Sequence, residues 1–325
     1  MPSTNSQSTP RISVIMPAYN TADLIAGSLD SVFQQTFSDF EVVLVNDGSP
    51  DTPQLEKVLE RFLHDHPEKM VYIRQENKRA AGARNTAIAR ARGEFLAFLD
   101  SDDSWTSDHL ASQMKLFDED PTLDFVYSNG LRVGNPNRQR EFMQFCPSHG
   151  TPDFEALVEE RCHIPVSTVV VRKSAIVRAG MFDESMPRCD DYDMWLRTAF
   201  HGAKFSYTKK VQARLNGGRP GSLGASRARM AEAYLNILEK TMKSLPLSDS
   251  QRTLVQKQAT EVRARYCLEE GKYRLQQREF DQAKNFLREA NLYFRRSKVS
   301  LVLLGLAIAP KTTSRLAFLM GEIRN

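Results

Sequence analysis

The chain has 325 residues, of which 41% are hydrophobic and 26% are charged. This composition is ordinary for a soluble globular protein, and the length favours one large domain followed by a smaller one. The four cysteines are scattered, without C-x-x-C or zinc-finger spacing, so we expect reduced thiols in a cytoplasmic protein.

The net charge of +4 conceals two oppositely charged halves. Residues 1–203 hold 20 Lys and Arg against 30 Asp and Glu, whereas residues 204–325 hold 24 against 10. An acidic half suits a metal ion, and a basic half suits phosphates, nucleic acid or an anionic membrane. We expect no nucleic acid to bind, because no recognised binding motif accompanies the basic residues. Residues 1–10 are polar and lack the apolar core of a signal peptide, which predicts a short disordered lead.

Short apolar runs alternate with helix-length amphipathic segments between residues 11 and 129. Their periodicity predicts strands at 12–16, 40–45, 71–73 and 95–99, and helices at 22–35, 55–63 and 80–91. This order predicts an α/β fold with a mainly parallel sheet flanked by helices. No G-x-G-x-x-G follows the first strand, so the sequence does not indicate a dinucleotide-binding fold.

The chain changes to an all-helical pattern after a glycine-rich loop, residues 217–224. Before this loop we expect a polar loop at 135–140, a β-rich run at 164–171 and a helix at 190–200. After it, the periodicity predicts helices at 227–242, 249–270, 273–277 and 281–295. We therefore expect a sheet domain of residues 11–222 and a small helical domain of residues 223–325.

Three small residues in the helical part, Gly271, Ala283 and Ala290, match one tetratricopeptide-type helix pair. Arrays of such pairs need about three repeats to be stable. A single pair therefore predicts a helical hairpin docked on the sheet domain and not a peptide-binding solenoid.

The apolar segment 299–309 has basic residues on both sides. It is shorter than the roughly 20 residues that span a bilayer. Two interpretations stay open, namely a core helix of the C-terminal domain or a helix lying on an anionic membrane surface.

The apolar run at residues 96–99 ends in three carboxylates, Asp100, Asp102 and Asp103. Acids spaced D-x-D at a strand end suit Mg²⁺ or Mn²⁺ bound to a diphosphate, although alone such a turn is more typical of a solvated helix cap. Three further motifs favour the metal: Pro17-Ala18-Tyr19-Asn20, Val45-Asn46-Asp47-Gly48-Ser49 and Gly82-Ala83-Arg84-Asn85. All lie at strand ends or helix starts, which meet at one edge of a parallel sheet.

With this order and spacing the chain resembles the family 2 glycosyltransferases of the GT-A fold, over about residues 11–222. Two downstream segments add to the resemblance, Gly-Met-Phe-Asp-Glu at 180–184 and Asp-Asp-Tyr-Asp-Met-Trp-Leu-Arg at 190–197. The resemblance implies that Asp191 is the catalytic base, although Asp190 stands where the family usually has glutamate. Trp195, one helical turn after Asp191, is expected in the core.

The resemblance implies an inverting, metal-dependent transfer of a sugar from a nucleotide-diphosphate donor, most simply a UDP-sugar, to a hydroxyl of a glycan or lipid-linked acceptor. Asp102 and Asp100 would hold Mn²⁺ or Mg²⁺, which neutralises the leaving diphosphate. Asp191 would accept the proton of the acceptor hydroxyl. The nucleotide-sugar-binding residues that it implies are Pro17, Ala18, Tyr19, Asp47, Arg84, Asp100, Ser101, Arg214 and Ser222. The acceptor site is expected within residues 131–158, and the basic C-terminus would allow peripheral contact with the cytoplasmic face of a membrane.

Two other functions fit the sequence less well. A sugar-nucleotide pyrophosphorylase would need a glycine-rich and basic loop after the first strand, and that loop is absent. A catalytically inactive transferase-like binding module, with a helical domain that recruits partners, would be favoured by loss of the acids at 102 or 191. Both acids are present.

Overall fold

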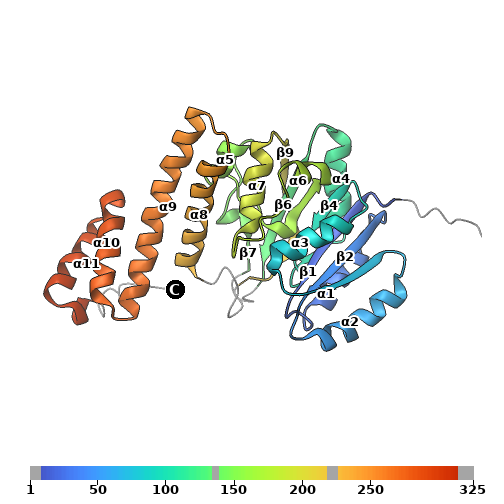
Figure 1. Ribbon diagram of the computed structural model, residues 1–325, viewed down its shortest axis with the longest axis horizontal. Coiled ribbons are helices and arrows are strands. Elements are labelled where there is room, and N and C mark those ends of the chain that lie inside the picture. Colours follow the sequence, from blue (N-terminus) through green and yellow to red (C-terminus); the bar gives the residue numbers. More distant parts are fainter. Residues whose placement is uncertain (1–8, 134–138, 218–225, 314–325) are drawn as a thin grey trace, which may run out of the picture. The chain divides into compact units, whose positions relative to one another are not determined.

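The computed structural model describes residues 9–133, 139–217 and 226–313, and it is shown in Figure 1. The chain divides into two compact units, residues 1–219 and 220–325. The domain boundary predicted between residues 222 and 223 lies outside the described residues, as do the first eight residues of the predicted lead.

The first part of the sheet unit alternates strands and helices in the predicted order. The elements are β1 (Ile12–Ala18), α1 (Ile25–Phe33), β2 (Phe40–Asp47), α2 (Thr52–Asp65), β3 (Met70–Gln75), α3 (Arg79–Arg90) and β4 (Phe95–Phe98). These four strands lie in the order β3-β2-β1-β4, and every neighbouring pair is parallel. The predicted α/β class with a parallel sheet flanked by helices is confirmed.

The sheet becomes mixed beyond β4. The remaining elements of this unit are β5 (Ser104–Trp105), α4 (His109–Glu119), β6 (Phe125–Arg132), β7 (Arg140–Glu141), α5 (Phe154–Val158), β8 (Val169–Arg172), α6 (Lys173–Arg178), α7 (Asp190–Phe200) and β9 (Phe205–Leu215). β8 is antiparallel to both β4 and β6, whereas β6 and β9 are parallel. In the described residues the sheet therefore continues as β4-β8-β6-β9-β5, with β7 paired to β6.

Two local predictions in this region were wrong in part. Residue 140, expected in a loop, starts β7, because Arg140 pairs with Arg132 of β6. Residues 134–138 of that loop lie outside the described residues. The expected β-rich run at 164–171 begins instead with a 3₁₀ turn, Val166–Thr168, whose Thr168 hydroxyl donates to the Pro165 carbonyl at 2.7 Å. Its strand pairing starts only at Val169.

The strands bury alternate residues on two faces of the sheet, as a two-residue period requires. One face packs against α1, α2 and α4 through a continuous apolar cluster that includes Val14, Leu29, Leu59 and Leu110. On the other face, Phe98 of β4 meets Trp195 of α7 edge to face, with ring centroids 5.7 Å apart. Trp195 is 1% exposed, so its predicted place in the core is confirmed.

The helical unit contains α8 (Arg227–Ser244), α9 (Asp249–Gln276), α10 (Phe280–Phe294) and α11 (Ser297–Ile308). A capping box, in which Ser248 and Gln251 satisfy each other's backbone N–H groups, starts α9. The separate helix predicted at 273–277 was wrong, because α9 continues through Gly271 without a break. A glycine inside a helix costs about 1 kcal/mol but does not end it. Here the small residue lets α10 approach α9 closely, since a Cβ on Gly271 would lie 2.8 Å from Cγ of Leu287.

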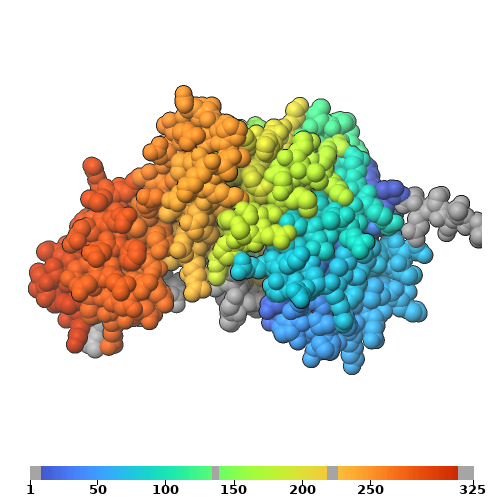
Figure 2. Space-filling model, viewed as in Figure 1, coloured from blue at the N-terminus to red at the C-terminus, as the bar shows by residue number. Residues whose placement is uncertain are grey.

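The last described helix, α11, is drawn in red in Figure 2. It packs Leu306 into a cluster with Leu268 and Leu287, as the core interpretation expected. Its opposite face is exposed. Within the described residues, no helix combines the length and the apolar character that crossing a bilayer requires.

Candidate active site

The site lies at the edge of the sheet where β1, β2 and β4 end. Because these strands are parallel, their carboxyl ends bring the first, second and fourth motifs together. Hydrogen bonds join the three loops directly. The Asn20 N–H donates to Oγ of Ser49 at 2.7 Å, and the hydroxyls of Thr21 and Ser101 are 2.9 Å apart.

The loop after β2 holds Asp47 in a fixed position. Asp47 is buried, and its Oδ1 accepts hydrogen bonds from Nε2 of Gln75 at 2.6 Å and from the Lys78 N–H at 2.8 Å. Gly48 follows with φ +65°, and a Cβ there would lie 2.8 Å from the backbone nitrogen of Asn77. Only glycine fits this turn without strain.

The acidic loop after β4 carries Asp100, Asp102 and Asp103. The Asp100 N–H donates to Oγ of Ser167 at 3.1 Å, and Oδ1 of Asp103 accepts from the Asn216 N–H at 2.7 Å. Burial and the neighbouring charges of Asp100 and Asp102 raise the pKa of Asp103 to about 8. Asp102 is half-buried. The loop is thus attached at both ends by hydrogen bonds and carries three acidic side chains within four residues.

Arg84 of α3 connects the acidic loop to α7. Its Nη2 donates to Oδ1 of Asp100 at 2.7 Å, and its Nη1 donates to Oδ2 of Asp190 at 2.6 Å. The side chains of Arg84 and Asp190 are only 5% and 10% exposed. Burial alone would lower the pKa of Arg84, but the three nearby carboxylates outweigh it and raise that pKa. One guanidinium therefore brings Asp100 together with the acid that precedes Asp191.

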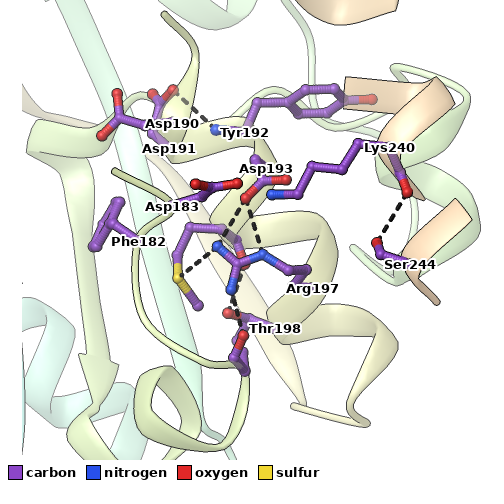
Figure 3. Close-up of polar contacts among 12 residues, drawn as sticks. Phe182, Asp183, Asp190, Asp191, Tyr192, Asp193, Arg197, Thr198, Lys240 and Ser244 are labelled. Atoms are coloured by element: carbon purple, nitrogen blue, oxygen red, sulfur yellow. Dashed lines mark hydrogen bonds and ion pairs between the residues drawn. The ribbon is translucent and has the colours of Figure 1, made fainter. Parts of the chain in front are cut away.

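Asp191 lies in the first turn of α7, as Figure 3 shows. Burial and the adjacent charge of Asp190 raise its pKa to about 7, against the opposing effect of Arg84. Its Oδ1 accepts the Tyr192 N–H at 2.9 Å. Asp193, two residues on, is turned to a different partner: its Oδ2 accepts from both Nε and Nη2 of Arg197, at 2.9 and 2.8 Å. Asp193 thus stabilises the fold through Arg197. Asp191 is half-buried next to Asp190, which is paired with Arg84.

Two residues that position the site were not singled out from the sequence. Asn85 fastens α3 to the loop before α7, because its amide exchanges hydrogen bonds with the backbone of Phe182 at 2.9 and 3.0 Å. Ser167 accepts from Asp100 through its hydroxyl and from Nε1 of Trp105 through its carbonyl. The motifs at 82–85 and 180–184 contained a signal for Asn85, whereas nothing in the local sequence marked Ser167.

The remaining predicted contacts surround this centre. Pro17 and Ala18 end β1, and Tyr19 follows with half of its surface exposed. Ser101 is buried, with its carbonyl accepting from Oγ of Ser28 at 2.9 Å. Arg214 of β9 is exposed and pairs in register with Ser104, the residue after the acidic loop. Ser222 lies outside the described residues. The structure assigns no nucleotide contact to any of them, so these roles stay predictions.

The carboxylates of the acidic loop fit a magnesium or manganese ion. Among the described residues, no three His, Cys, Asp or Glu side chains converge as a preformed metal cage. An ion of this type is commonly held by one or two carboxylates and completes its oxygen ligands with substrate phosphates and water. Asp102 and Asp100 are of the right chemistry for such a partial set.

Comparison with known proteins agrees with this geometry. Residues 13–180 match the sequence profile described as "Glycosyl transferase family 2". The chain is 34% identical over 185 residues to WfgD of Escherichia coli, a "UDP-Glc:alpha-D-GlcNAc-diphosphoundecaprenol beta-1,3-glucosyltransferase". That match covers 57% of this chain and 68% of WfgD. The chain is also 30% identical over 203 residues to AmsB of Erwinia amylovora, an "Amylovoran biosynthesis glycosyltransferase", covering 59% and 65% of the two.

Solved structures share the fold at lower identity. The crystal structure of S. aureus TarS 1-349 superposes with a TM-score of 0.60 at 17% identity, covering 96% of this chain and 92% of that one. The mannosyltransferase PcManGT from Pyrobaculum calidifontis, in complex with GDP-Man and Mn²⁺, superposes with a TM-score of 0.62 at 20% identity, covering 96% and 88%. These neighbours have the GT-A fold that the sheet unit also adopts. The profile match spans more than half of the chain, and the protein is a glycosyltransferase that belongs to glycosyl transferase family 2.

Proposed function

We propose that this protein transfers a sugar from a UDP-linked donor, with inversion, to a hydroxyl of a glycan or lipid-linked acceptor. The observation that supports this most strongly is the double ion pair of Arg84. It brings the acidic loop, which suits the leaving diphosphate, next to Asp191, which suits the attacking hydroxyl. A single displacement needs these two sites on opposite sides of one sugar carbon, and it then inverts that carbon.

Asp191 is the proposed general base. A carboxylate with a pKa of about 7 is matched to proton abstraction near neutral pH. The ion pair of Asp190 with Arg84, and the two hydrogen bonds that Asp193 accepts from Arg197, favour Asp191 over these two acids. On this proposal Asp191 takes the acceptor proton while the sugar–diphosphate bond breaks.

Asp102 and Asp100 are the proposed ligands of Mn²⁺ or Mg²⁺. When bound, such an ion neutralises the charge that develops on the diphosphate as it leaves. We propose that Asp47 accepts a hydrogen bond from the base or ribose, and that Tyr19 and Arg214 contact the nucleotide and its phosphates. Their positions around the strand ends support these roles.

The acceptor class rests on the curated relatives. WfgD and WfaP of Escherichia coli are both described as acting on alpha-D-GlcNAc-diphosphoundecaprenol with UDP-Glc. We infer by analogy a lipid-linked acceptor for this chain, with peripheral contact at the cytoplasmic face of a membrane through its basic C-terminal unit.

Titration calorimetry of UDP, with and without Mn²⁺, tests the donor site. We expect Mn²⁺ to strengthen UDP binding and Asp102→Ala to abolish that gain, because the variant lacks the proposed metal ligand. The fold of the variant should stay intact, because a half-buried carboxylate at a sheet edge contributes little to packing. Asp65→Ala removes an exposed acid at the end of α2 and should leave the titration unchanged. If Asp102→Ala kept the Mn²⁺ effect, the metal assignment would be wrong. Normal UDP binding without any turnover would instead favour the inactive binding module.

A further inference from the structure

Helix α11 is apolar on both of its faces. Its inner face packs Val299, Val302, Leu303 and Leu306 against α9 and α10. The outer face carries a second set, Leu301, Leu304 and Ile308, whose exposed fractions are 67%, 60% and 76%. Residues spaced three, four and seven apart lie along one side of a helix, so these three form a continuous stripe. We call this stripe the outer face of α11.

A helix that is apolar all round is normally covered on every side. A surface helix of a globular protein has polar residues opposite its packed face. In α11 the positions opposite Leu306 are instead leucine and isoleucine. We therefore expect a partner to cover the apolar side chains of the outer face.

The charges around α11 indicate which partner that is. From residue 291 to residue 313 the sequence contains no Asp or Glu, whereas it contains Arg295, Arg296, Lys298 and Lys311. Arg295 and Arg296 follow the last residue of α10, where the helix dipole favours positive charge, whereas Lys298 lies in the first turn of α11, where the dipole disfavours it. Helix dipoles do not explain Lys298 or the lack of acidic residues from 291 to 313, whereas an anionic surface beside the helix explains both.

We propose that the outer face of α11 docks on an anionic lipid bilayer, with the flanking cations on the headgroups. An apolar stripe with basic flanks lies in the plane of the interface and buries its side chains by about 5–10 Å. Pairing of the outer faces of two copies of this chain would instead bring like charges together. The inference rests on the proposed function, since a lipid-linked acceptor is reached at such a surface.

Co-sedimentation of the full chain with vesicles tests this proposal. The probes are vesicles of phosphatidylcholine alone and vesicles with added phosphatidylglycerol, at low and high salt. We expect binding to the anionic vesicles only, weakening as salt rises. The triple variant Leu301→Gln, Leu304→Gln, Ile308→Gln should bind about tenfold or more weakly, because the apolar contact is lost. Arg295→Gln, Arg296→Gln, Lys298→Gln should weaken binding by about 10²-fold.

Matched controls separate this surface from general hydrophobicity and charge. Val177→Gln changes an exposed apolar residue of α6, and Lys57→Gln, Arg90→Gln, Lys209→Gln removes three cations from the sheet unit. Both controls should bind like the parent chain. Equal pelleting with both vesicle types, or with neither, would overturn the proposal.

Two further outcomes would assign the outer face to a different partner and also overturn it. One is an apolar triple variant that unfolds at a lower temperature and binds vesicles normally, which would mean that the chain covers this face itself. The other is a change in oligomeric state by light scattering with unchanged vesicle binding, which would mean a second copy. UDP titration of the same variants is independent of lipid, so a failed donor site and a failed membrane site are distinguishable.

Discussion

Arg84 holds two acids of the proposed active site in place, in addition to its proposed contact with the nucleotide. Its guanidinium is shared between Asp100 and Asp190, and it is the cation that lowers the pKa of Asp191 against burial. Removing one partner of a buried ion pair leaves an uncompensated charge and costs about 3–5 kcal/mol. Arg84 therefore links the proposed donor side, at Asp100, to the proposed acceptor side, at the start of α7.

Replacing Arg84 should change the pH dependence of the reaction. Arg84→Gln removes the positive charge, so the pKa of Asp191 rises further and the acidic limb of kcat/KM moves to higher pH. Arg84→Lys keeps a charge but cannot bridge two carboxylates as a fork, so kcat should fall while the limb stays in place. A pH–rate profile of each variant measures this. Identical limbs in all three proteins would contradict the electrostatic role.

Asp191→Asn tests the proposed general base. The amide is nearly isosteric but cannot accept the acceptor proton, so kcat should fall about 10²-fold or more while UDP affinity stays unchanged. In the parent chain kcat/KM should fall as the pH drops below about 7, because the active form is the carboxylate. Asp193→Asn is the contrasting variant, expected to lower the melting temperature of the sheet unit, because it removes the charge of the buried ion pair with Arg197. A normal turnover rate in Asp191→Asn would move the role to another group.

At the scale of secondary structure, Gly271 determines how closely α9 and α10 pack. A Cβ there would lie 2.8 Å from Cγ of Leu287 and 3.2 Å from its backbone nitrogen. Overpacking costs about 1–3 kcal/mol, against about 1 kcal/mol gained from the better helix propensity of alanine. Gly271→Ala should thus destabilise the protein by about 1 kcal/mol.

A second helical glycine provides the matched control for Gly271. Gly27 of α1 has nothing within 4 Å of a Cβ. Gly27→Ala should stabilise the protein by about 0.5–1 kcal/mol through propensity alone. Scanning calorimetry of both variants measures the two signs. If Gly271→Ala stabilised the protein, α9 and α10 would be less tightly packed in solution than in the structure.

The elements that were predictable are those with strong local signals. α7 was predicted from Asp190 to Phe200, as observed, because acids open it and its apolar residues recur at helical spacing. The prediction that the helix ends before Gly271 was wrong. This glycine stands inside α9 because the close packing of α10 leaves no room for a Cβ there. The order of the parallel strands predicted that Asp47 and the acidic loop after β4 would lie at the same edge of the sheet. The Arg84–Asp190 pair did not, since 106 residues separate the two and no local pattern encodes that contact.

At the scale of the whole molecule, each unit has an apolar core of its own. The sheet unit is built around residues such as Val14, Leu44 and Leu110, and the helical unit around Leu268, Leu275 and Leu287. The two units also differ in charge, with the acids concentrated before residue 204 and the bases after it. Separate cores predict separate unfolding transitions, for which a single melting temperature is not defined.

Donor binding should stabilise one of these transitions and not the other. A ligand at 100 times its dissociation constant stabilises the folded state by about 2.7 kcal/mol, which raises the melting temperature of a unit of this size by about 5–10 °C. UDP with Mn²⁺ should therefore shift only the transition of the sheet unit, and Gly271→Ala only that of the helical unit. Asp102→Ala should remove the ligand-induced shift while leaving the ligand-free scan unchanged. A single transition displaced by both the ligand and Gly271→Ala would show instead that the two cores unfold as one.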